Sequence, residues 1–92
     1  RRIPKSSSSV VRSATLLAEQ GSRALEEGEH DRAYELFSRA IELDPANTEA
    51  WLGKAMMAEQ PTEKRLCLQR VLSLDPGNET ARAALEKLNT TV

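Results

Sequence analysis

The sequence predicts an all-α protein, an α-solenoid of antiparallel helical hairpins with about five helices. Ala, Leu, Glu, Arg and Lys, which are strong helix formers, dominate the 92 residues. No β-branched run alternates with a period of two, so no strand is predicted. The octamer LDPANTEA at residues 43–50 also returns as LDPGNETA at residues 74–81, 31 residues later. A turn repeated at this distance between helical stretches is typical of a solenoid.

The first two helices are delimited by a glycine and a proline. Apolar residues step by three and four from about Ser9, and Gly28 is expected to stop this helix in the left-handed conformation. The second helix is expected over about His30 to Leu43. Pro45 ends it, because the residue before a proline is disfavoured in the α region.

Three shorter helices are expected after the first octamer. Asn47 and Asn78 are the expected N-caps of the third and fifth helices. Pro61 separates the third helix from the fourth. The expected ranges are Thr48 to Glu59, Thr62 to Leu74 and Glu79 to Leu88.

Each expected helix carries an apolar stripe, and these stripes are the candidate core. The positions are Ala14, Leu17, Ala18, Gly21, Ala24, Leu25, Ala33, Leu36, Phe37, Ala40, Ile41, Leu43, Trp51, Leu52, Ala55, Met56, Leu68, Val71, Leu72, Ala81, Ala84, Leu85 and Leu88, with Cys67 and Leu74 beside them. Trp51 could stack on a ligand, but its place on the stripe favours packing between the hairpins. Its truncation to Ala is expected to cost on the order of 3–5 kcal/mol.

Charge is unevenly distributed along the chain. Residues 1–12 hold four bases and no acid, so the remaining nine bases face all 14 acids, a net −5. Residues 1–8 are interpreted as a flexible basic, Ser-rich linker ahead of a helical domain at residues 9–92. Such a tail could touch nucleic acid or an anionic membrane, but a solvated linker is favoured, and we expect no nucleic-acid partner.

Composition also limits the cellular compartment and the kinds of functional site that we expect for this chain. A single cysteine permits no internal disulfide, and the sequence contains neither a signal peptide nor an apolar run of membrane-spanning length. We expect a cytoplasmic fragment of a longer protein, because the chain lacks an initiator Met. His30 and Cys67 have no companion motif, and no metal-ligand spacing or phosphate loop is present. No catalytic, metal or cofactor site is therefore predicted.

Residues 14–47 resemble a tetratricopeptide repeat. The family pattern has spaced aromatic and small residues in two helices and a final proline. The match in this chain is carried by Leu17, Gln20, Gly21, Ala24, Gly28, Ala33, Phe37, Ala40 and Pro45. Residues 48–78 resemble a second unit with Trp51 and Ala55 in place, whereas Lys54 and Lys64 depart from the pattern. Residues 79–89 resemble the helix that closes such arrays.

The second unit is three residues shorter than the first. We expect the missing residues to lie between the two helices of the hairpin, where Gln60, Pro61 and Thr62 replace a longer glycine turn. The second hairpin is therefore expected to be shorter than the first and closed by a tightened turn.

The resemblance implies a protein-interaction module with a concave groove lined by the first helix of each hairpin. A peptide or an amphipathic helix would suit its small and apolar residues. The cationic clamp that some relatives use for C-terminal carboxylates is not visible at Ala18, Ser22, Gly53, Thr80 and Ala84, so recognition of an acidic chaperone tail is not expected. The implied groove residues are Ala18, Ser22, Leu25, Glu49, Leu52, Met56, Thr80, Ala83 and Lys87.

Several alternatives remain open at this level. The same face could be ordinary surface or a contact with other domains of a parent chain. A short array also exposes end faces, so self-association into a homo-oligomer or a scaffold is a second hypothesis. A third is that the domain is a regulatory appendage of an enzyme in a longer chain.

Overall fold

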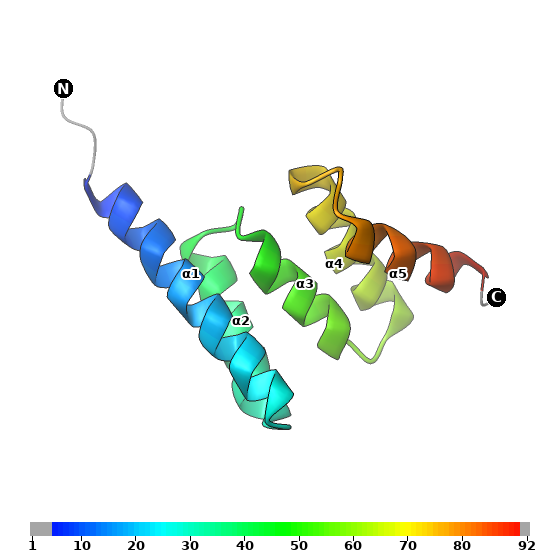
Figure 1. Ribbon diagram of the computed structural model, residues 1–92, viewed down its shortest axis with the longest axis horizontal. Helices are drawn as coiled ribbons and strands as arrows, with labels where there is room; N and C mark the ends of the chain where they lie inside the picture. Colours follow the sequence, from blue (N-terminus) through cyan, green and yellow to red (C-terminus); the bar gives the residue numbers. More distant parts are fainter. Residues whose placement is uncertain (1–4, 91–92) are drawn as a thin grey trace.

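Residues 5–90 fold into five helices in two layers. The computed structural model describes the backbone of residues 5–90 and the side chains of residues 9–89. Its helices are α1 Lys5–Glu26, α2 His30–Leu43, α3 Thr48–Met57, α4 Pro61–Leu74 and α5 Glu79–Thr90, and no strand occurs between residues 5 and 90. In Figure 1, α1, α3 and α5 lie toward the viewer and α2 and α4 lie behind them. The predicted all-α class is confirmed.

Helix α1 begins earlier than expected. The sequence favoured a linker over residues 1–8, yet the backbone is helical from Lys5; residues 1–4 of that segment lie outside the described residues. Serine costs only a few tenths of a kcal/mol per residue in a helix, and extending an existing helix needs no new nucleus. The amphipathic stripe downstream therefore carries the helix through the serine run.

The first hairpin closes at Gly28 as predicted. Its φ is 82°, and no other glycine among the described residues has a positive φ. The Glu29 N–H donates to the Ala24 carbonyl at 2.8 Å and the Gly28 N–H donates to the Leu25 carbonyl at 3.1 Å. These two bonds form a Schellman motif, which satisfies carbonyls at the end of α1 and turns the chain into α2.

The repeated octamer forms the same turn and helix N-cap twice. The Asn47 side chain accepts from the Ala50 N–H at 2.9 Å, and Asn78 accepts from the Ala81 N–H at the same distance. In each copy the Asn N–H also donates to the carbonyl of the preceding Asp, at 3.0 Å. Each octamer therefore ends one helix and caps the next, which confirms both predicted N-caps.

The shortening of the second hairpin lies in α3 and not in the turn. The turns at residues 27–29 and 58–60 both have three residues, and α2 and α4 both have 14. Helix α3 has only 10 residues, against 13 in the part of α1 that follows residue 13. The predicted tightened turn is wrong because Pro61 starts α4 instead of occupying the turn. Ala58 leaves α3 in an extended conformation.

The core consists of two clusters, and the first is organised around Phe37. The Phe37 ring has no exposed surface, and it lies among alanines of α1, α2 and α3. A Cβ added at Gly21 would stand 2.8 Å from the Phe37 Cε1, and one added at Gly53 would come closer still to the Cζ. The ring therefore occupies space that only glycine leaves free on both neighbouring helices.

The second cluster joins α3, α4 and α5. Leu68, Val71, Cys67, Ala55 and Ala81 are buried there. Around them pack half-buried side chains of α3, α4 and α5, namely Trp51, Leu52, Leu72, Ala84, Leu85 and Leu88.

Three expected core positions are exposed. Leu43 and Leu74, which begin the two octamers, are 41% and 38% exposed. They belong to the last turn of α2 and of α4, where the chain already leaves the neighbouring helix. Met56 is 60% exposed, whereas the next residue, Met57, packs against the first core cluster. The stripes of α2 and α4 were thus predicted one turn too far, and at the end of α3 the core position is Met57 and not Met56.

Gly53→Ala is expected to lower the free energy of unfolding by about 1–3 kcal/mol, because its methyl group would overlap the enclosed Phe37 ring. Gly77→Ala is the matched control, since no atom lies closer than 4.0 Å to the added Cβ. It should be neutral or stabilising by less than about 1 kcal/mol. Urea denaturation followed by circular dichroism measures both; equal effects would contradict the proposed role of Gly53.

Candidate functional site

A cavity of about 310 Å³ opens between α1 and α3. Its wall on α1 consists of Ser22, Leu25 and Glu26, and its wall on α3 consists of Glu49, Leu52 and Met56. Gly53 and the Phe37 ring form its floor. Leu25 and Leu52 are half-buried. The cavity is therefore mainly apolar inside and carries carboxylates at its edge.

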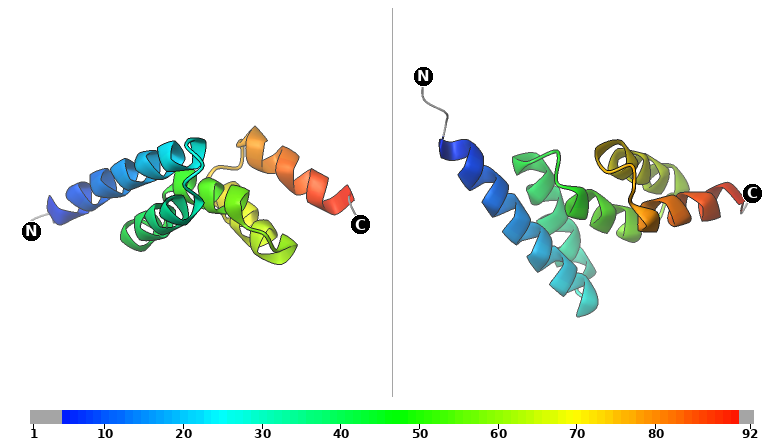
Figure 2. Two further views of the ribbon diagram at one scale, coloured as in Figure 1. Left: turned by 90° about the horizontal axis from the view of Figure 1, so that it is seen from below. Right: turned by 45° about the horizontal axis from the view of Figure 1, so that its top comes forward.

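A second cavity, of about 200 Å³, lies on the other side of α3, toward α5. Leu52 and Met56 line this cavity as well. The other lining residues come from α3, α4 and α5, namely Ala55, Lys64, Leu68, Thr80 and Ala84. The left view of Figure 2 shows α1 and α5 flanking α3. The two cavities therefore adjoin along α3, and together we call them the groove.

One polar contact ties the two sides of the first cavity together. The Ser22 hydroxyl donates to the Glu49 carboxylate at 3.1 Å. Glu49 lies in the first turn of α3, where the positive end of the helix dipole favours a carboxylate. The Ser22 hydroxyl and the helix terminus therefore both hold the carboxylate at the edge of the groove.

The structure places most of the predicted groove residues around these cavities. The α1–α3 cavity is lined by Ser22, Leu25, Glu49, Leu52 and Met56, and the α3–α5 cavity by Thr80. Ala18 is fully buried and packs in the first core cluster. Ala83 and Lys87 are exposed on α5 and line neither cavity.

Sequence reasoning missed Glu26 and Lys64. Glu26 follows Ser22 by one helical turn, so the spacing of the implied groove residues on α1 would have found it. From the sequence, Lys64 is a departure from the repeat pattern whose stem is expected to lie along the surface with its ammonium in water, and it is not an expected groove residue. It is half-buried beside Leu68 and Ala84, so its hydrocarbon stem lies along the apolar surface as amphipathic side chains do.

Trp51 and Lys54 have structural contacts outside the groove. The Trp51 indole N–H donates to the Pro45 carbonyl at 2.7 Å, and the Arg70 guanidinium lies 5.3 Å from the ring centroid. The Lys54 ammonium lies 5.0 Å from the Tyr34 ring centroid. These cation–π contacts link α3 to α4 and to α2. They support the interpretation of Trp51 as a packing residue.

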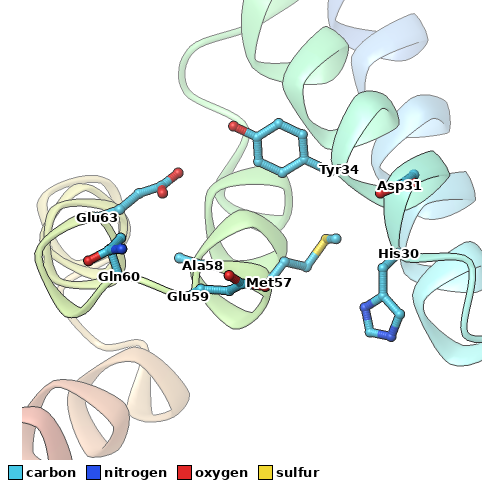
Figure 3. Close-up of a pocket in the computed structure, with 8 residues that line it drawn as sticks. All are labelled: His30, Asp31, Tyr34, Met57, Ala58, Glu59, Gln60 and Glu63. Atoms are coloured by element: carbon cyan, nitrogen blue, oxygen red, sulfur yellow. The ribbon is translucent and has the colours of Figure 1, made fainter.

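A polar cavity of about 370 Å³ lies between the start of α2 and the α3–α4 turn. Figure 3 shows Tyr34 and Asp31 on one side and Glu63 and Gln60 on the other, with His30 turned away from Glu63. All the ionisable groups that line it, apart from His30 and Tyr34, are carboxylic acids. Within the described part of the chain, no group of three or more metal-ligating side chains converges.

Cys67 and His30 lie in different environments. Cys67 is buried in the second core cluster, whereas His30 is exposed at the first residue of α2. Burial raises the pKa of the Cys67 thiol above its ordinary value of 9.0, Lys54 lowers it and Glu63 raises it. A thiol held protonated in this way is a poor nucleophile. Among the described helices, none combines the length and the apolar character that a membrane span requires.

Comparison with known proteins agrees with this architecture. A family model described as "Tetratricopeptide repeat" matches residues 24–62, from the last turn of α1 to the start of α4. The fold is similar to a solved structure described as "First TPR of Spaghetti (RPAP3) bound to HSP90 peptide SRMEEVD". The TM-score is 0.51 and the identity is 18%, over 85% of this chain and 91% of that one. The resemblance inferred from the sequence is confirmed.

The raised pKa of Cys67 predicts a pH dependence of stability. The unfolded chain releases the thiol proton at a lower pH than the folded chain, so the thiol contributes stability below about pH 9.0. That contribution is lost as the pH rises through the folded-state pKa. The free energy of unfolding should therefore fall less at alkaline pH in Cys67→Ala than in the unsubstituted chain. Parallel pH profiles in urea denaturation would contradict the assignment.

Proposed function

We propose that this chain, which resembles tetratricopeptide repeat proteins over residues 24–62 and in its fold, is a non-catalytic protein-interaction module that binds a peptide or an amphipathic helix in the groove. The family match and the fold support an interaction module. The similar solved structure is that of a domain bound to a peptide. The groove of this chain, lined mainly by α1, α3, α4 and α5, supports the finer statement.

The observation that carries the proposal is the position of Met56. Its side chain is 60% exposed, although it lies between two cavities that are lined mostly by apolar atoms. Exposed methionines suit recognition surfaces, because the unbranched thioether adapts to a partner. Burying Met56 and Leu52 under a partner would remove apolar area from water at one central point of the groove.

The size of the groove limits the affinity. It extends only from α1 across α3 to α4 and α5, so a bound peptide would bury less area than a standard protein interface. We therefore expect modest affinity, which depends on a few central contacts.

Met56→Glu is expected to abolish partner binding without unfolding the chain, because the side chain has little core burial to lose. Leu66→Glu is the matched control, since Leu66 is 62% exposed on α4 and lines neither cavity of the groove. Crosslinking and mass spectrometry from native extract should identify partners that are lost with Met56→Glu and kept with Leu66→Glu.

The double variant Leu52→Glu with Met56→Glu extends this test. It should keep its helical circular dichroism signal and lose the same partners. Leu52 also packs on the second core cluster, so Met56→Glu alone is the cleaner variant. Partners lost equally with Leu66→Glu would show that the wrong face was chosen.

Self-association is the second candidate function, and exposed leucines favour it. Leu16 on α1 and Leu66 on α4 are 54% and 62% exposed. If two chains stack through these side chains, sedimentation velocity will show a dimer at high concentration, and Leu16→Glu with Leu66→Glu will be monomeric. A strict monomer at all concentrations excludes this candidate.

A further inference from the structure

The two halves of the groove differ in charge. The α1–α3 cavity is lined by two carboxylates, Glu26 and Glu49, and by no cationic side chain. The α3–α5 cavity is lined by Lys64 and by no acid. Apart from the hydroxyl groups of Ser22 and Thr80, the other lining residues are apolar, and Leu52 and Met56 are common to both halves. A ligand that spans the groove therefore meets negative charge over α1 and an apolar surface with one positive charge toward α5.

We propose that the groove selects a peptide with a basic side chain followed or preceded by an aliphatic anchor, and that it discriminates against acidic peptides. This rests on the proposed function and adds the chemistry of the partner. The Lys or Arg of the peptide pairs with Glu49 and Glu26. The aliphatic anchor enters the α3–α5 cavity against Leu52, Met56 and Ala84.

Glu49 is suited to the basic side chain. One of its oxygens, Oε2, accepts from Ser22, and an ionised carboxylate has further lone pairs on both oxygens for an ammonium or a guanidinium. The Ser22 contact also reduces the conformational freedom that Glu49 would lose on binding. Glu49 is exposed, so the pair is formed at the edge of the groove and remains sensitive to salt.

The length of α3 sets the spacing of the two features in the peptide. Glu49 and Met56 are separated by seven residues on one helix, which corresponds to about 10 Å along its axis. An extended peptide covers this distance in about three residues. The expected motif therefore places the basic residue and the anchor at least about three positions apart, because the α3–α5 cavity also lies across α3 from the α1 side.

The same charges disfavour an acidic ligand. The peptide bound to the similar solved domain, SRMEEVD, contains three acidic side chains. In this groove such side chains would face Glu26 and Glu49 over α1. Like charges at an interface oppose association and slow the encounter.

The test is a fluorescence-anisotropy titration of the chain with three labelled ten-residue peptides of Gly and Ser. The first carries Lys and Leu three positions apart, the second replaces the Lys by Glu, and the third replaces the Leu by Ala; SRMEEVD is the fourth probe. The Lys–Leu peptide should bind most tightly, and its affinity should fall as salt is raised.

Glu49→Gln should weaken binding of the Lys–Leu peptide about threefold to fivefold, as expected for a partly exposed ion pair. Glu49→Lys should reverse the preference between the Lys and the Glu peptides. Glu35→Gln, which removes an exposed carboxylate of α2 that lines neither half of the groove, is the matched control and should change nothing.

The outcomes separate this inference from the proposed function. Equal or tighter binding of the Glu peptide or of SRMEEVD overturns the charge preference, and so does a lack of binding of the Lys–Leu peptide at millimolar concentration. If Met56→Glu still abolishes capture of partners in those cases, the groove remains the binding site. If Met56→Glu leaves binding of the Lys–Leu peptide unchanged, both the inference and the groove assignment fail.

Discussion

The structure depends on the enclosure of one aromatic ring. Phe37 is the largest side chain in the fold with essentially no exposed surface, and the chain holds only three aromatic residues. Its ring fills the space between α1 and α3 because Gly21 and Gly53 offer no Cβ there. The remaining contacts of this cluster come mainly from alanines, which bury little apolar area each. In a 92-residue chain, where net stability is small, three helices therefore depend on one well-packed ring.

The turn and N-cap formed by each octamer then determine where the helix that follows each hairpin begins. Asn47 and Asn78 cap their helices with the same geometry, so α3 and α5 start from equivalent turns. Between them α4 keeps the length of α2, and only α3 is shorter. At the end of this shorter helix, Met57 packs against the first core cluster and Met56 is left exposed beside the groove. The difference of three residues between the two units is therefore located in the helix that lines both cavities.

Local signals made most of the fold predictable from sequence. Gly28, Asn47, Asn78 and Pro61 act on the backbone within a few residues, so the helix boundaries beside them followed to within two residues, whereas the start of α1 at Lys5 did not. The sequence did not show which element of the second unit is three residues shorter, because the number of residues between the two octamers is the same for a shorter helix and for a shorter turn. For the site, the resemblance to a known repeat implied nine residues, of which six line the two cavities. Ala18 was among the nine, although tertiary packing buries it completely. Lys64 was not, although it lines the α3–α5 cavity.

The enclosure of Phe37 and the shape of the groove are two consequences of the same residue. Gly53 leaves room for the ring below α3, and it also forms the floor of the α1–α3 cavity. A larger side chain at this position would have to displace the ring, so the floor of the groove cannot change without cost to the core. Variation in binding is therefore confined to the edge, where Glu26, Glu49, Met56 and Lys64 can be replaced at little cost in stability. We therefore propose that Glu26, Glu49, Lys64 and the exposed Met56 set partner preference, while the packing around Phe37 beneath them stays fixed.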